Sequence, residues 1–174
     1  MKGIKKMSSS LETISGGKQA NNTGNALESF VEHILKEKEY TEFVNHKEQV
    51  FAMRKAIGGK QYSKQPYCGQ SIYETKRNCD FLVLNKEKFP ESLIIECKWQ
   101  QVDGSVDEKY PFTVHNIMKI GSPTIILIDG GGYKKQALVW LKEQAGKDRA
   151  LIGVYTMTEF QTIANKGFLG EISI

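Results

Sequence analysis

The sequence has few of the features that mark several common protein classes. Its 174 residues include only four prolines and three cysteines. The cysteines are odd in number and form no Cys-x-x-Cys pair, which argues against a disulfide framework or a zinc cage and favours a reducing interior. No apolar run approaches the roughly 18 residues that a membrane-spanning helix needs. The sequence therefore predicts a cytoplasmic protein without a membrane anchor.

The composition that remains suits one compact domain. Hydrophobic residues make up 40% of the chain and charged residues 25%, which are ordinary proportions for a globular fold. Residues 1–21 are rich in Lys, Ser and Gly, so we expect a flexible basic N-terminal arm there and the folded domain over residues 22–174. The net charge of +4 permits an anionic partner such as nucleic acid but does not require one.

Hydrophobic periodicity predicts the order of the helices and strands. The expected helices cover residues 24–38, with Thr23 as N-cap, 111–120, 137–144 and 158–163, and the expected strands cover residues 71–75, 80–84, 92–98, 124–128 and 151–155. Residues 58–70 are polar and predict a loop, whereas residues 40–57 fit either period. The strands at 80–84 and 92–98 are separated by a short polar turn, which is typical of a hairpin. This order predicts a single α/β domain with a mixed β-sheet flanked by α-helices.

Two short motifs contain the residues that indicate a catalytic site. Asp80 begins one strand of the predicted hairpin, and Glu96 and Lys98 lie near the end of the other. Residues i and i+2 of a strand point to the same face, so Glu96 and Lys98 share a face and Asp80 can lie beside them. Two carboxylates and an ammonium group would then converge at one end of the sheet. An ordinary cross-strand ion pair is the alternative interpretation.

This combination of groups matches the needs of Mg²⁺. The ion takes one or two carboxylates and fills its other positions with water and substrate phosphate. Asp80 and Glu96 supply the carboxylates, and the backbone carbonyl of Cys97 offers a third oxygen. Mn²⁺ is a possible substitute. Lys98 beside the ion would orient or deprotonate water, or neutralise charge on the phosphoryl group.

Asp80 followed by Glu96-Cys97-Lys98 resembles the core motif of the PD-(D/E)XK nuclease superfamily, which has a restriction-endonuclease-like fold. The proline of that motif is absent, since Asn78 and Cys79 precede Asp80. Gln100 extends the motif to Glu-x-Lys-x-Gln, a form similar to that of several restriction enzymes. The resemblance also implies a first-helix Glu near the metal. Glu28 is the matching residue, and a solvated helix position is the alternative for it.

Several basic residues are candidates for contact with DNA. Residues 104–109 resemble a Gly-Ser/Thr-x-x-Glu-Lys segment of some restriction-type members, which implies a phosphate contact for Lys109; a helix cap with a solvated Lys is the alternative. Lys134 and Lys135 follow a glycine turn whose amides could hold a phosphate. Arg77 lies in a stretch that mixes tyrosines with basic residues, a composition that suits nucleic-acid binding as well as an ordinary strand and loop.

These features predict a Mg²⁺-dependent DNA endonuclease. A chain of one compact domain, without a helicase or methyltransferase domain, favours a type II restriction-type enzyme. The resemblance implies a homodimer, because such enzymes often dimerise to cut both strands. A junction-resolving or repair nuclease with the same chemistry is the second hypothesis, and a non-catalytic DNA-binding domain on this fold is the third.

Overall fold

The computed structural model describes residues 16–43, 59–101 and 107–172, and everything below refers to these ranges. Their centre is a six-stranded sheet with the spatial order β1-β2-β5-β6-β7-β8. The strands are β1 (Thr41–Glu42), β2 (Gln61–Lys64), β5 (Phe81–Asn85), β6 (Phe89–Trp99), β7 (Thr124–Asp129) and β8 (Leu151–Tyr155). β5 pairs antiparallel with both of its neighbours, β2 and β6, whereas β6, β7 and β8 run parallel. The sheet is therefore mixed.

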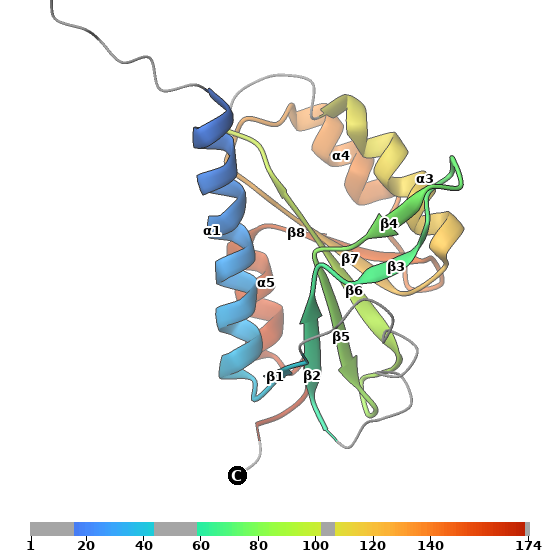
Figure 1. Cartoon of the computed structure of the whole chain (residues 1–174). Coiled ribbons are helices and arrows are strands. Elements are labelled where there is room, and N and C mark those ends of the chain that lie inside the picture. Colours follow the sequence, from blue (N-terminus) through green and yellow to red (C-terminus); the bar gives the residue numbers. More distant parts are fainter. Residues whose placement is uncertain (1–15, 44–58, 102–106, 173–174) are drawn as a thin grey trace, which may run out of the picture.

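Helices cover both faces of this sheet (Figure 1). The helices are α1 (Gly16–Glu37), α3 (Tyr110–Ile120), α4 (Lys135–Glu143) and α5 (Met157–Asn165), with a 3-10 turn, η1 (Asp107–Lys109), before α3. α1 and α5 lie side by side on one face, and their apolar residues form one core cluster with Ile95, Ile125 and Leu127. α3 and α4 cover the other face, where Ile126 and Ile128 belong to a second cluster. β7 is consequently buried on both sides, as its continuous apolar run predicts.

A separate two-stranded ribbon, β3 (Tyr67–Gln70) and β4 (Lys76–Asn78), leaves the main sheet between β2 and β5. Figure 1 shows that it extends toward α3. The ribbon is held there by a hydrogen bond of 2.8 Å from the Ile72 N–H to the Asn116 side-chain oxygen. The ring of Tyr73 also stacks on Phe112, with 5.4 Å between ring centroids. β4 leads directly into the Cys79–Asp80 step and thus connects the ribbon to the motif.

The fold class is the predicted one, a single α/β domain whose mixed sheet is flanked by helices. The predicted hairpin is also confirmed, because β5 pairs antiparallel with β6. Helices and strands occur close to the predicted places from residue 80 onward. Among the described residues, no helix combines the length and the apolar character needed to cross a membrane.

Two predicted segments are wrong. Residues 58–70 were expected to form a loop, but they contain β2 and β3. Residues 71–75 were expected to form a strand, but they are the turn of the ribbon, closed by a 2.9 Å hydrogen bond from the Ser71 N–H to the Thr75 carbonyl. The reason is that β2 and β3 are short and mostly polar. Their pairing partners stabilise them, and their own residues carry little period-2 signal.

The first helix begins earlier than predicted. α1 starts at Gly16, so Thr23 lies inside the helix and is not its N-cap. The helix therefore includes residues 16–21, which were assigned to the arm, while residues 1–15 lie outside the described ranges. Residues 44–58 and 102–106, which include part of the 104–109 segment, also lie outside them.

Candidate active site

The pairing of β5 with β6 positions the two acidic residues. Phe81 is paired with Ile95, which places Asp80 opposite Glu96 at the mouth of the hairpin. One carboxylate oxygen of Asp80, Oδ2, accepts a 2.7 Å hydrogen bond from the Cys97 N–H. This bond fixes the carboxylate beside β6. The pairing of β5 with β6 therefore brings Asp80 beside Glu96, as the predicted hairpin requires.

Lys98 is the group on which the neighbouring oxygens converge. Its Nζ lies 2.8 Å from Glu96 Oε2, 3.7 Å from Asp80 Oδ2 and 3.3 Å from the Cys97 carbonyl oxygen. The Glu96 side chain is only 5% exposed and that of Lys98 26% exposed, so the cluster is largely shielded from solvent. A shielded cluster strengthens the attraction between its opposite charges.

The two carboxylates also control the protonation of Lys98. Burial alone lowers the pKa of Lys98, but attraction to Glu96 and Asp80 outweighs burial and raises its pKa above the usual value of 10.5. Lys98 is therefore a charged ammonium group at neutral pH. In this state it can donate hydrogen bonds to an anion and neutralise charge.

Arg77 is a second cation in the cluster. Its Nη2 lies 2.8 Å from Glu96 Oε1, and its side chain is 17% exposed. The sequence suggests Arg77 only for contact with DNA, because its position three residues before Asp80 gives no sign of a contact with Glu96. The contact depends on the course of β4 past the end of β6, which only the tertiary structure defines.

Glu28 of α1 approaches the same cluster from the helix. Burial is the main cause that raises the pKa of Glu28, and repulsion from Asp80 adds to it. A hydrogen bond from Gln65 and the charge of Lys98 act in the opposite direction. The Gln65 side chain also donates to Asp80 Oδ1 at 3.1 Å. Gln65 had no predicted role, since it lies in the supposed loop.

Gln100 lies outside this cluster of contacts. β6 ends at Trp99, so the alternation that would place Gln100 beside Lys98 does not continue. The buried amide of Gln100 instead donates to the Gly132 carbonyl at 3.0 Å and accepts from the Tyr110 hydroxyl at 2.9 Å. In the structure it therefore connects the end of β6 to α3 and to the glycine turn after β7.

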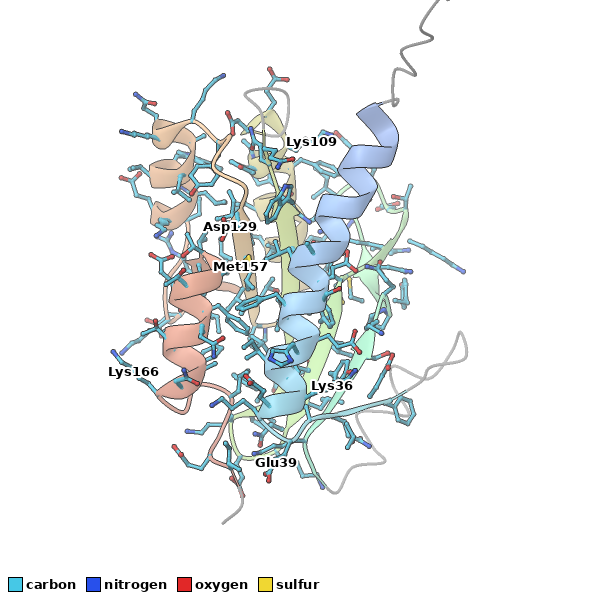
Figure 2. The ribbon with its side chains drawn as sticks, turned by 90° about the vertical axis from the view of Figure 1, so that its left-hand side faces the viewer. Lys36, Glu39, Lys109, Asp129, Met157 and Lys166 are labelled. Atoms are coloured by element: carbon cyan, nitrogen blue, oxygen red, sulfur yellow. The ribbon has the colours of Figure 1, made fainter. Side chains whose placement is uncertain are left out.

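The three lysines proposed for DNA contact lie on neighbouring surface segments. Lys109 precedes α3, and Lys134 and Lys135 lie at the start of α4. All three are exposed. Among the described residues, no hydrogen bond or ion pair joins them to Asp80, Glu96 or Lys98. Figure 2 shows Lys109 near the end of the molecule that lies beyond Asp129 and the start of α5.

Asp129, at the end of β7, was not singled out in the sequence and has a structural role. Its Oδ2 accepts a 3.0 Å hydrogen bond from the Met157 N–H, and Figure 2 shows the two residues close together. Its Oδ1 accepts from the Gly130 N–H at 2.8 Å. The carboxylate thus satisfies an otherwise free N–H at the start of α5 and stabilises the turn that contacts Gln100.

The oxygen atoms of the cluster fit a divalent cation in number and kind. In the described part of the chain, no group of three or more His, Cys, Asp or Glu is arranged to hold a metal. Mg²⁺, however, needs only one or two carboxylates when water and substrate complete its shell. Asp80 Oδ2, Glu96 Oε2 and the Cys97 carbonyl already surround one positive atom, Lys98 Nζ. The carboxylates of Asp80 and Glu96 and the carbonyl of Cys97 would hold the ion, which would replace a cationic side chain that now contacts them.

Comparison with known proteins identifies one family. The family model described as a PD-(D/E)XK nuclease superfamily domain matches residues 19–168, which include the whole main sheet and all candidate site residues. No curated protein and no solved structure matches the chain significantly.

Proposed function

Because the chain belongs to the PD-(D/E)XK nuclease superfamily, we propose that it is a metal-dependent endodeoxyribonuclease that hydrolyses phosphodiester bonds of DNA in the cytoplasm. The observation that carries this proposal is the convergence of Asp80, Glu96 and the Cys97 carbonyl on one cationic position. Nucleases of this family act on nucleic acids, and the cluster contains the acidic and basic groups that phosphodiester hydrolysis uses.

In this proposal each residue of the cluster has a distinct task. Asp80 and Glu96 bind Mg²⁺ or Mn²⁺, and the Cys97 N–H keeps the Asp80 carboxylate in place. The bound ion would supply charge stabilisation at the phosphoryl group and lower the pKa of water. Lys98 donates hydrogen bonds to the attacking water or to a phosphate oxygen, as its positive charge favours.

Two further residues complete the proposed site. Glu28 has a raised pKa and interacts electrostatically with Asp80 and Lys98, and in this proposal it holds the attacking water by a hydrogen bond or accepts its proton. Gln100 supports the site indirectly, because its amide fixes the end of β6 to the segments on either side. Lys109, Lys134 and Lys135 would contact backbone phosphates.

Within the family, we favour a type II restriction-type enzyme that acts as a homodimer. The Glu-x-Lys-x-Gln pattern and the similarity of residues 104–109 to a segment of restriction-type members support this choice. A junction-resolving or repair nuclease would use the same residues and differ in the DNA structure that it prefers.

The decisive experiment is incubation of the purified protein with supercoiled plasmid, a sequence-diverse linear DNA and a four-way junction, with Mg²⁺ or with EDTA. Discrete bands from plasmid and linear DNA support a restriction enzyme, whereas cuts confined to the junction support a resolving enzyme. A lack of Mg²⁺-dependent cleavage of every substrate would contradict the nuclease proposal.

Two variants test whether the cleavage comes from this site. Asp80→Asn and Glu96→Gln each remove one carboxylate charge with almost no change in shape, so we expect folded proteins without Mg²⁺-dependent cleavage. Glu143→Gln on α4 is the matched control, since Glu143 is exposed and its side chain has no hydrogen bond or ion pair among the described residues. Cleavage by either site variant at a near wild-type rate would contradict the metal assignment.

A further inference from the structure

Both carboxylate oxygens of Glu96 are already paired with cations. Oε2 accepts from Lys98 at 2.8 Å, and Oε1 is 2.8 Å from Arg77 Nη2. The Glu96 side chain is nearly buried, so water replaces these partners poorly. A metal ion that binds Glu96 must therefore compete with at least one of them.

The charges of the cluster make this competition costly. Asp80 and Glu96 carry two negative charges, and Lys98 and Arg77 carry two positive charges, so the four groups are balanced. A divalent cation adds two positive charges at close range in a shielded place, where like charges repel strongly. Arg77 or Lys98 must move away before the ion is stable.

Of the two cations paired with Glu96, Arg77 makes fewer contacts than Lys98. A guanidinium has five N–H donors, and among the described residues its side chain has one hydrogen-bonded partner, Glu96. Its Nε is buried and has no hydrogen-bond acceptor. Lys98, by contrast, contacts Glu96, Asp80 and the Cys97 carbonyl.

Arg77 reaches Glu96 from outside the sheet that carries the site. It lies on β4 of the ribbon, and the ribbon is not hydrogen-bonded into the six-stranded sheet that carries Glu96 and Lys98. The tip of the ribbon is open to solvent, where Tyr73 is 71% exposed. A change of the Arg77 side-chain rotamer can therefore withdraw the guanidinium from Glu96 while the strands of the sheet stay in place.

We infer that Arg77 is a positioning residue that occupies Glu96 in the metal-free protein and competes with the divalent cation for it. Arg77 thereby lowers the metal affinity of the free protein, and loading of the site requires the guanidinium to leave Glu96. This inference depends on the proposed function in one respect, the use of Asp80 and Glu96 as metal ligands.

The test is the Mn²⁺ affinity of the protein alone, measured by isothermal titration calorimetry at neutral pH without nucleic acid. Arg77→Met should bind Mn²⁺ about tenfold more tightly than wild type, since it removes the positive charge that competes with the ion for Glu96. Arg77→Lys keeps the charge and should bind nearly as wild type does. Lys76→Met is the matched control, because it removes a charge from an exposed neighbour on the same strand.

Each pattern of affinities has a definite meaning. Tighter binding by Arg77→Met alone supports competition at Glu96. If Arg77→Met and Lys76→Met both bind Mn²⁺ more tightly to the same extent, the increase comes from the lower net charge, and the inference is overturned. Equal Mn²⁺ affinity of wild type and Arg77→Met would also overturn it. Absence of Mn²⁺ binding in every protein would instead contradict the metal site of the proposed function.

A measurement on the wild-type protein keeps the test independent of how the variants fold. The chain has only three arginines, at positions 54, 77 and 149, so their ¹⁵N side-chain signals are few enough to assign. Addition of Mg²⁺, which does not broaden the signals as Mn²⁺ would, should shift the Arg77 signals and leave those of Arg149 in place. Unchanged Arg77 signals at saturating Mg²⁺ would contradict its departure from Glu96.

Discussion

Lys98 combines two properties that rarely occur in one surface lysine. It is mostly shielded from solvent, and two carboxylates hold its ammonium group within 3.7 Å. The same contacts raise its pKa and keep it charged. A charged, positioned donor beside the proposed metal ligands suits stabilisation of charge that develops during phosphoryl transfer.

Replacement of Lys98 by Met should separate catalysis from binding. We expect Lys98→Met to lower the single-turnover rate of cleavage by roughly 10²-fold or more, the usual scale for such a contact. DNA affinity should fall only modestly, because one charge is a small part of a polyelectrolyte interface. Quenched-flow cleavage and fluorescence anisotropy measure the two quantities.

The control for this variant is Lys166→Met, which removes the exposed lysine at the C-cap of α5 that Figure 2 labels. Its cleavage rate should equal that of wild type. If Lys98→Met also cleaves at the wild-type rate and loses only a little stability, Lys98 is a structural ion-pair partner and has no part in the chemistry.

The attachment of α1 to the sheet depends on a polar cluster as well as on the apolar core. Glu32 on α1 accepts hydrogen bonds from Lys36, from the Tyr62 hydroxyl and from Lys64, the last two on β2. Glu32 resembles a solvated helix residue in the sequence, but it joins the helix to β2 of the sheet. Because α1 carries Glu28, this attachment also positions the helix at the site.

The contacts of Glu32 should make stability depend on pH. The hydrogen bond from Lys36 is the largest of several contacts that lower the pKa of Glu32 to about 2. Since this lies below the usual value of 4.5, the carboxylate stabilises the fold above about pH 5 and loses that contribution as the pH falls toward 2. Glu32→Gln should lose about 1 kcal/mol of unfolding free energy at pH 7.

Urea unfolding at several pH values measures this effect. The difference between wild type and Glu32→Gln should shrink steadily from pH 5 downward. Glu37→Gln serves as the control on the same helix, since Glu37 contacts only the exposed His33 among the described residues. A difference that stays constant across this range would show that Glu32 contributes by packing and not by charge.

The turn after β7 brings the ends of two strands into close contact. A Cβ added to Gly130 would lie 2.4 Å from the Gln100 carbonyl oxygen, and the residue has a φ of +102°. Gly130→Ala should therefore lower the unfolding free energy by about 2–4 kcal/mol. Gly131 is a matched control, because its φ is +73° but no atom lies within 4 Å of its added Cβ. Gly131→Ala should cost only about 1 kcal/mol.

Thermal or urea unfolding of the two alanine variants decides this prediction. Equal losses in both would mean that backbone conformation alone is responsible and that the close approach to Gln100 has no influence. Loss of cleavage in Gly130→Ala at temperatures where it is fully folded would further show that the end of β6 must be held for the site to function.

The molecule as a whole combines an apolar core on both faces of its sheet with basic side chains on its surface. The described surface carries exposed lysines at the starts of α3 and α4. Contacts of such lysines with DNA phosphates release condensed cations, so binding depends steeply on salt. The net charge of +4 is small, so the proposed DNA binding would depend on where these lysines lie.

DNA affinity should therefore fall linearly with salt on a double logarithmic plot, measured with EDTA to prevent cleavage. Each phosphate contact contributes a slope of about −0.9 for duplex DNA. A Lys134→Met, Lys135→Met double variant should reduce the magnitude of this slope by the contribution of about two phosphate contacts. Affinity that is flat with salt would contradict a nucleic-acid ligand, and an unchanged slope in the double variant would remove these lysines from the interface.

The sequence by itself determined the features that depend on local pattern. The short apolar runs within residues 80–84, 92–98 and 124–128 specified the central strands, because a strand segment that is buried on both faces is continuously hydrophobic. Period-2 alternation placed Glu96 and Lys98 on one face, and the short turn of the hairpin placed Asp80 beside them. The fold class and the three motif residues of the cluster could therefore be expected from short stretches of chain.

Only the tertiary structure decided which other residues join this cluster. Arg77 and Gln65 come from polar segments whose strands form through pairing with distant partners, so their sequence carries little signal. Gln100 continues the alternating pattern in the sequence, but β6 ends before it and packing directs its amide to Gly132 and Tyr110. Alternation describes one strand, whereas the neighbours of a side chain depend on where several separate segments end and cross.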